Sequence, residues 1–210
     1  MSITLVLIAV TCIVSFLAFS NANIMEKLIF SPVEIDNKKT YFRFVTSGLL
    51  HADVGHLLIN MFVLWSFGEY VEAFLIQNTQ YGAFLYLLLY FGGVVVSSIP
   101  SFFRHRFDAG YRSLGASGAV EAVVFASILI SPMSKICLYG ILCLPAVVMG
   151  LCFLGYEYYM GKRKGDNINH SAHFTGALFG FGFMGLCFLD RKSTRLNSSH
   201  VSQSRMPSSA

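Results

Sequence analysis

Six apolar stretches dominate the sequence and limit the folds that it can adopt. They cover residues 3–19, 56–76, 81–99, 114–130, 136–156 and 172–189, and each is close to the ~20 residues that a helix needs to cross a bilayer. Only 12% of the 210 residues are charged, roughly half the fraction typical of soluble domains. Because lipid does not tolerate an open sheet edge, the sequence predicts an all-α membrane protein with six transmembrane helices.

The chain divides into one membrane domain and a tail. Residues 1–190 are predicted to form a six-helix bundle with a long first loop, from residue 20 to about residue 55. That loop mixes aromatic and charged side chains, as expected for a structured element at headgroup level. Residues 191–210 are polar, rich in serine and without periodicity, so we expect a disordered tail that is not a native part of the domain.

The remaining composition excludes several classes of protein. A net charge of +4 gives no sign of a nucleic-acid partner, and the first apolar stretch lacks the basic leader of a signal peptide. None of the cysteines has metal-ligand spacing. We therefore interpret them as small packing residues rather than disulfide partners: Cys12, Cys137, Cys143, Cys152 and Cys187.

The fourth stretch begins with a serine between two glycines, Gly115 and Gly118. Glycine lowers helix propensity by about 1 kcal/mol relative to alanine, but it lets helices approach closely. At the start of a helix, Ser117 would lie beside free backbone N–H groups that can stabilise negative charge. The alternative is a simple packing patch, with the serine bonded to its own helix.

Two further stretches carry polar groups on one face. His56 and Asn60 are four residues apart, hence on the same side of the second helix. On the sixth, His173 precedes Gly176 and Gly180, a GxxxG strip that allows intimate packing. These groups could instead only join helices by hydrogen bonds. If the glycine-bearing helices pack together, Ser117 and His173 can meet.

Acidic groups in the spans have several interpretations. Glu121 follows Ser117 by one helical turn, and we expect it to be neutral and structural, because an unpaired carboxylate in a span is costly. As an alternative, an ionised Glu121 could stabilise the imidazolium of His173. The fifth stretch contains Pro145, expected to kink or break the helix. It ends in an interfacial belt: Tyr156, Glu157, Tyr158 and Tyr159.

Two chemistries fit these intramembrane groups. In the first, Ser117 is a nucleophile and His173 its general base, with His56 and Asn60 donating hydrogen bonds to an oxyanion. In the second, a metal is bound by four histidines: His51, His56, His170 and His173. The histidine spacings lack the HExxH pattern of a catalytic zinc helix, so the sequence favours the serine mechanism.

Three motifs resemble those of the rhomboid intramembrane serine proteases. Gly115-Ala116-Ser117-Gly118 is similar to their GxSG, and residues 172–176 resemble the AHxxG of the last core helix. His51, His56 and Asn60 resemble an HxxxxHxxxN pattern on the second helix. Because the motifs lie on the expected helices, the resemblance is specific and covers residues 1–190.

The resemblance implies a six-helix rhomboid-like bundle whose cavity opens to the non-cytoplasmic side. Ser117 and His173 would form a dyad without a third acidic member, and His56 and Asn60 would be oxyanion donors. Supporting positions would be His51, Gly115, Gly118, Glu121 and Gly176, and Glu72 would help to hold the first loop. Membrane-anchored protein substrates, cut in or near their spans, and membrane lipid would be the partners. No metal or cofactor is expected, and the bacterial inner (plasma) membrane is the implied location.

The charge distribution disagrees with that orientation. With the N-terminus inside, most Lys and Arg residues would lie in outer loops, which inverts the positive-inside expectation. We nevertheless favour the orientation of the family. Two other function classes remain: a catalytically silent rhomboid-like binding factor, and a small transporter or channel.

Overall fold

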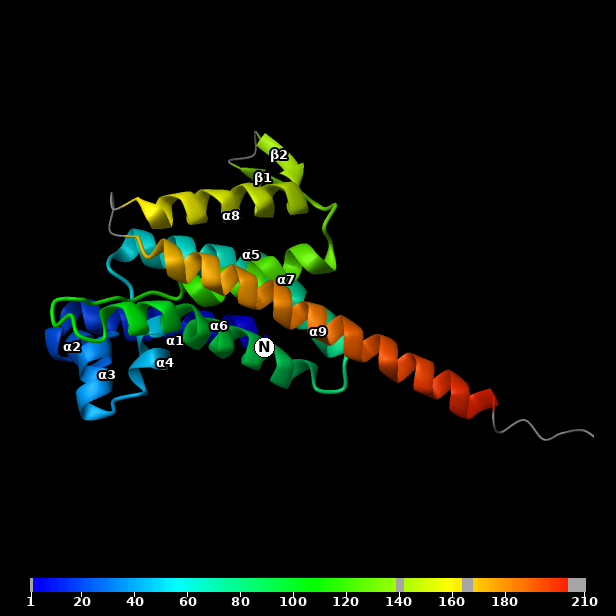
Figure 1. Ribbon diagram of the computed structural model, residues 1–210, viewed down its shortest axis with the longest axis horizontal. Helices are drawn as coiled ribbons and strands as arrows, with labels where there is room; N and C mark the ends of the chain where they lie inside the picture. Colours follow the sequence, from blue (N-terminus) through cyan, green and yellow to red (C-terminus); the bar gives the residue numbers. More distant parts are fainter. Residues whose placement is uncertain (1, 139–141, 164–167, 204–210) are drawn as a thin grey trace, which may run out of the picture.

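The computed structural model describes residues 2–138, 142–163 and 168–203, without the side chains of residues 138, 142 and 190–203. Within that part, the body consists of long helices (Figure 1): α1 (Ile3–Ser20), α5 (Val54–Asn78), α6 (Gly82–His105), α7 (Ser117–Ile130), α8 (Ala146–Lys162) and α9 (His170–Gln203). The first loop holds short helices: α2 (Ala22–Leu28), α3 (Pro32–Lys38), α4 (Arg43–Thr46) and the 3-10 helix η1 (Ser47–Leu49). A hairpin, β1 (Lys135–Leu138) and β2 (Leu142–Pro145), precedes α8.

The expected membrane architecture is confirmed in its coarse form. Among the described residues, α1, α5, α6 and the His170–Leu189 part of α9 are long and apolar enough to cross a membrane. The helices α7 and α8 have 14 and 17 residues, so six spans stay a prediction. A helix of 14 residues is roughly 21 Å long, shorter than the ~30 Å hydrocarbon core.

Small side chains allow α7 to pack at the centre of the bundle. It lies against α5, α6 and α9, and small residues predominate among its buried ones, including Ala119, Ala122 and Ala126. On α6, a Cβ added at Gly93 would lie 2.9 Å from both the Cα of Ala119 and the Cβ of Ala122. Larger residues at these places would separate the helices, so the sequence itself sets the close packing.

The contact between α7 and α9 uses the glycine strip found in the sequence. A Cβ at Gly176 would overlap the carbonyl group of Gly118, and one at Gly180 would overlap that of Ala122. The backbones of the two helices therefore touch directly. This confirms the expectation that the helix carrying His173 packs against the helix that Ser117 begins.

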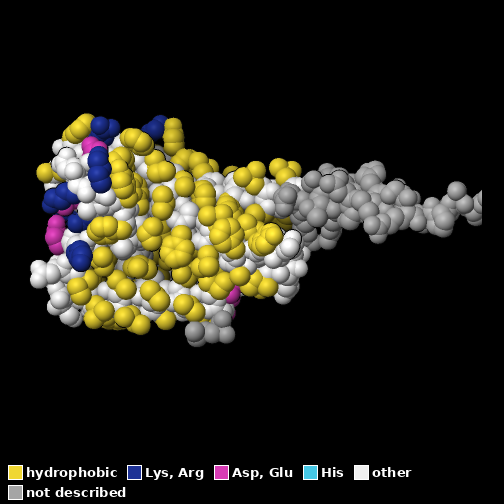
Figure 2. Space-filling model, turned by 90° about the horizontal axis from the view of Figure 1, so that it is seen from below, with side chains coloured by type: hydrophobic (Ala, Val, Ile, Leu, Met, Phe, Trp, Pro, Cys, Tyr) yellow, Lys and Arg dark blue, Asp and Glu magenta, His cyan; other side chains and the backbone are white. Residues whose placement is uncertain are grey.

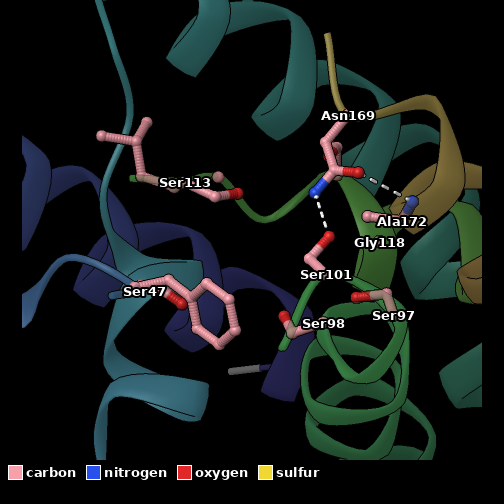
Figure 3. Close-up of a pocket in the computed structure, with 12 residues that line it drawn as sticks. Ser47, Ser97, Ser98, Ser101, Ser113, Gly118, Asn169 and Ala172 are labelled. Carbon is pink, nitrogen blue, oxygen red and sulfur yellow. Dashed lines mark hydrogen bonds between the residues drawn. The ribbon is translucent and has the colours of Figure 1, made fainter. Parts of the chain in front are cut away.

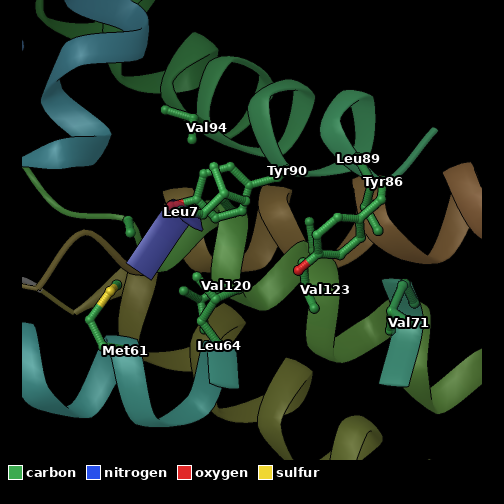
Figure 4. Packing of buried hydrophobic residues seen from close by; sticks show 14 of the residues in the cluster. Leu7, Met61, Leu64, Val71, Tyr86, Leu89, Tyr90, Val94, Val120 and Val123 are labelled. Atoms are coloured by element: carbon green, nitrogen blue, oxygen red, sulfur yellow. The ribbon is translucent and has the colours of Figure 1, made fainter. Parts of the chain in front are cut away.

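The largest apolar cluster lies between α1, α5, α6 and α7 (Figure 4). Leu7 of α1, Leu64 of α5, Tyr90 of α6 and Val123 of α7 are all buried in it. Because lipid tails are as apolar as these side chains, their van der Waals fit rather than water exclusion holds the spans together.

Glu72 ties α1 to α5. Its carboxylate accepts hydrogen bonds from the backbone N–H of Ile3 (2.7 Å) and from the N–H (2.9 Å) and hydroxyl (2.7 Å) of Thr4. The expectation that Glu72 holds the first loop is therefore wrong. The first turn of a helix has unpaired N–H groups and forms the positive end of the helix dipole. The buried carboxylate of Glu72 accepts hydrogen bonds from these N–H groups, and its negative charge is stabilised by the dipole.

The fifth apolar stretch does not form a continuous helix. Residues 135–138 and 142–145 pair as the two strands of the hairpin instead, and Pro145 directly precedes α8 rather than kinking it. The hairpin register places Cys137 opposite Cys143, and the two form a disulfide. Our interpretation of these two cysteines as unpaired packing residues is wrong, because a β-hairpin brings together side chains that a helix would separate.

The helix α9 continues beyond the boundary that the sequence predicts at residue 190. It is helical as far as Gln203, where a disordered tail was expected. Extending an existing helix is far less costly than starting one, so the change to polar residues does not end it. Residues 204–210 lie outside the described part, and the division into a 1–190 domain and a 191–210 tail stays a prediction.

Candidate functional site

The first loop holds the segment that leads into α7. Phe30 and Ser113 exchange two backbone hydrogen bonds of 3.0 and 3.1 Å, and the N–H of Gly115 donates to the carbonyl oxygen of Ser47 (3.0 Å). The expected structured first loop is thus present, and it is joined to the residues before Ser117.

Ser117 is the first residue of α7 and is partly buried. Gly115 has φ +124°, a backbone conformation that glycine adopts without the strain a side chain would cause. This turn brings the chain into the helix at Ser117. The first N–H groups of an α-helix, here those of Ser117 and Gly118, have no acceptor inside it and lie at the positive end of its dipole.

The ring of His56 lies against Gly115. A Cβ added at Gly115 would be 2.9 Å from the Cε1 atom of His56 and 3.3 Å from its Nε2. The N–H of Ala52 points to Nδ1 of the same ring at 3.5 Å, so Nδ1 is the acceptor. In the neutral ring the proton is then on Nε2, which makes this atom a hydrogen-bond donor two residues from Ser117.

Asn60 is buried one turn further along α5. Its Nδ2 donates to the carbonyl oxygen of His56 (2.9 Å), within the same helix. One amide N–H is therefore used locally, and a second is available for another acceptor. The face shared by His56 and Asn60 is as the sequence spacing predicts.

His51 is fully buried beside His56, and the two rings meet edge to face at 5.0 Å. Its Nδ1 lies 3.0 Å from the hydroxyl of Ser15, which itself donates to the carbonyl oxygen of Leu49 (2.8 Å). The proton between the two side chains therefore belongs to Nδ1, and Nε2 is buried without a partner among the described residues. Burial, with the nearby His56, lowers the pKa of His51 to about 4.

The start of α9 brings His173 to the level of Ser117. A Cβ at Gly118 would lie 3.6 Å from the carbonyl oxygen of Ala172, so the residues next to Ser117 and His173 are in contact. Asn169 caps this end of α9: its Oδ1 accepts from the N–H of Ala172 (3.2 Å), and its Nδ2 donates to Ser101 of α6 (2.9 Å).

An acidic partner of His173 lies on α8, where the sequence indicated an interfacial belt. Glu157 is only 3% exposed. Its Oε1 lies 3.5 Å from Nδ1 of His173 and its Oε2 lies 2.7 Å from Nδ1 of His170. The belt interpretation is wrong for this residue, although its tyrosine neighbours are exposed. One signal was available: the HxxH spacing of the two histidines puts them on one face, which needs a partner.

Glu121, unlike Glu157, makes no hydrogen bond or ion pair with His173 among the described residues. It lies on α7 with its side chain partly exposed. Its neutral, structural role stays a prediction. For the metal alternative, no group of three or more His, Cys, Asp or Glu side chains in the described ranges could hold an ion.

A polar cavity of about 30 Å³ adjoins Ser117 (Figure 3). A water molecule needs ~10–15 Å³ of such space, so the cavity can hold roughly two. Serine hydroxyl groups from α6, η1 and the segment before α7 face it, and Asn169 closes one side. Its polar lining consists of Ser47, Ser97, Ser98, Ser101, Ser113, Ser117 and Asn169.

A model of the Rhomboid domain matches residues 38–190, which include every motif described above. The chain belongs to the rhomboid family. It is 27% identical over 162 residues to RHOMBOID-like protein 12, mitochondrial, of Arabidopsis thaliana, a match that covers 69% of this chain and 46% of that protein. It is also 31% identical over 157 residues to Presenilin-associated rhomboid-like protein A, mitochondrial, of Danio rerio (67% and 36%).

A bacterial relative is the Rhomboid protease GluP of Bacillus subtilis, 28% identical over 141 residues. That match covers 67% of this chain and 25% of the relative. The matched part is thus less than half the length of each of these three rhomboid proteins.

Proposed function

We propose that this rhomboid protein is an intramembrane serine endopeptidase that cleaves membrane-anchored proteins in or near their transmembrane segments. The observation that carries the proposal is the convergence at the start of α7. Ser117 begins the helix, the ring of His56 lies against Gly115, and the helix bearing His173 packs on Gly118. The name of the B. subtilis relative, a rhomboid protease, supports the same reaction class.

In the proposed reaction, Ser117 Oγ forms a bond to the carbonyl carbon of the substrate, and its proton passes to Nε2 of His173. Negative charge develops on the carbonyl oxygen. The N–H groups at the start of α7 and Nε2–H of His56 stabilise it, together with the remaining N–H of Asn60. The C–N bond then breaks, His173 protonates the leaving amine, and the acyl group remains on Ser117.

Hydrolysis of this acyl-enzyme requires water inside an apolar bundle. The serine-lined cavity next to Ser117 supplies a place for it. A water from the cavity gives a proton to His173 and adds to the acyl carbon. The bond to Ser117 Oγ breaks, His173 returns the proton to Oγ, and a carboxylic acid is released.

The test is cleavage of a transmembrane substrate by purified protein in liposomes. Ser117→Ala and His173→Ala should each abolish cleavage and labelling by a fluorophosphonate, because members of such a pair act as a unit. Ser127→Ala is the matched control: Ser127 is a buried serine of the same helix that donates to the carbonyl oxygen of Val124 (2.7 Å). Cleavage by Ser117→Ala at the wild-type rate would refute the serine mechanism, and chelator sensitivity would then point to a metal.

The alternative function is a catalytically silent rhomboid-like binding factor. It predicts a wild-type protein that retains a membrane protein but neither cleaves it nor reacts with the fluorophosphonate. For location we propose the bacterial plasma membrane, in line with the bacterial relative. Fractionation of bacterial cells that express the protein tests this, and recovery outside that membrane would contradict it.

A further inference from the structure

Glu157 places one carboxylate between two histidines of the neighbouring helix. Its Oε2 is 2.7 Å from Nδ1 of His170, and its Oε1 is 3.5 Å from Nδ1 of His173. The histidines are three residues apart, so both rings face α8 from the same side of α9. A carboxylate that is 3% exposed needs donors of this kind to remain ionised.

We propose that Glu157 is a positioning residue for His173 and that His170 holds its carboxylate in place. The inference rests on the proposed function. A carboxylate at Nδ1 keeps the proton on that nitrogen and leaves Nε2 unprotonated, in the form that can accept the proton of Ser117. After the transfer, the same carboxylate stabilises the imidazolium. The family resemblance implies no third acidic member, so Glu157 goes beyond that expectation.

The surroundings single out Glu157 for this role. Among the described residues, the other titratable groups that face this cluster include His56 of α5, which is close to His173, and Glu121 of α7, which is close to Glu157. The ring of Tyr156 on α8 is 5.8 Å from that of His170. Of the two carboxylates, only Glu157 has a recorded contact with His173 in the described part. The 3.5 Å separation is long for a hydrogen bond, but such contacts often tighten once substrate is bound.

The test compares three variants with wild type in the liposome assay. Glu157→Gln removes the charge and keeps the shape, and should lower kcat roughly 100-fold or more with KM unchanged, in the range of proton-transfer effects. Glu157→Asp keeps the charge and should recover part of that loss. His170→Gln leaves Glu157 intact but removes its 2.7 Å partner, and should lower kcat about 10-fold. The control is Glu72→Gln, another buried carboxylate, which should alter thermal stability but not kcat.

Ser117→Ala, measured alongside, separates the two proposals. If it still cleaves, the proposed function fails. If it is inactive while Glu157→Gln keeps wild-type kcat, only the role of Glu157 is overturned. Equal losses in Glu157→Gln and Glu157→Asp also overturn it, because charge would then not matter. If Glu157→Gln does not fold, His170→Gln decides, and an unchanged kcat in that variant refutes the inference.

Discussion

His56 and His173 have different neighbours at Nδ1, and that neighbour decides which ring nitrogen carries the proton. The N–H of Ala52 points at His56, so its Nε2 is the donor. Glu157 faces His173 and favours a proton on Nδ1, which leaves Nε2 as the acceptor. The same residue type can therefore donate to an oxyanion at one position and accept a proton at another.

The first prediction concerns the two proposed oxyanion donors. His56→Ala should lower kcat by roughly 100-fold to 1000-fold with little change in KM, as for a well-placed donor. Asn60→Ala should cost less, because one amide N–H already bonds within the helix. The control is Asn78→Ala, since Asn78 makes the same kind of bond, 2.8 Å to Phe74, at the other end of α5. An unchanged kcat in His56→Ala would remove His56 from the site.

The second prediction is a pH dependence of stability that originates at His51. Burial lowers its pKa to about 4, whereas the unfolded side chain titrates near 6.5. Between these values the unfolded state binds the proton and the folded state does not. The protein should therefore lose stability, by roughly 3 kcal/mol, as the pH falls from about 6.5 to 4.

Thermal unfolding in one detergent across that pH range tests this. His51→Gln should show a smaller loss than wild type, and His105→Gln, a change at the last residue of α6, should not. If wild type and His51→Gln depend on pH equally, the titration of His51 does not contribute.

At the scale of elements, the α7–α9 contact depends on glycine positions that a side chain would fill. Gly180→Ala should destabilise the protein by about 1–3 kcal/mol, because the added Cβ overlaps the carbonyl group of Ala122. Gly182→Ala is the matched control two residues away, with nothing within 4 Å of the added atom. It should be neutral or slightly stabilising, since alanine favours the helix. Thermal unfolding of the two variants gives the comparison, and equal stabilities would contradict close packing at Gly180.

The length of the apolar stretches was enough to predict the long helices, and the spacing of the glycines predicted that α7 and α9 pack together. The prediction failed where an apolar run could form more than one structure: the start of the fifth stretch was predicted to be helical, but residues 135–138 and 142–145 pair as strands joined by the disulfide of Cys137 and Cys143. It also misplaced Glu157, since a charge at the end of a span indicates the interface unless its partner is known. Its partners, His170 and His173, lie on the next helix, so no spacing within one helix links them to Glu157.

At the scale of the whole molecule, charged side chains gather at one end (Figure 2), the end that holds α2, α3 and α4 in Figure 1. Many of the basic ones are paired within the first loop or to it. Arg43 is buried, donates to the carbonyl oxygens of Glu26 (2.8 Å) and Ile29 (2.7 Å), and lies 3.6 Å from Glu34. Arg112 reaches Glu26 at 3.4 Å from the segment before α7. These contacts hold the first loop together and join it to the segment before α7, a role independent of membrane orientation.

The last prediction is that the charged end faces the non-cytoplasmic side. The count of Lys and Arg in short loops favours the opposite orientation, but their structural pairing gives those residues another reason to be there. Lys39→Cys, at the charged end, and Gln80→Cys, between α5 and α6, are placed in a background without Cys12, Cys152 and Cys187. In intact bacterial cells, a membrane-impermeant maleimide should label the first variant and should label the second only after permeabilisation. The reverse pattern would show that the site opens to the cytoplasm.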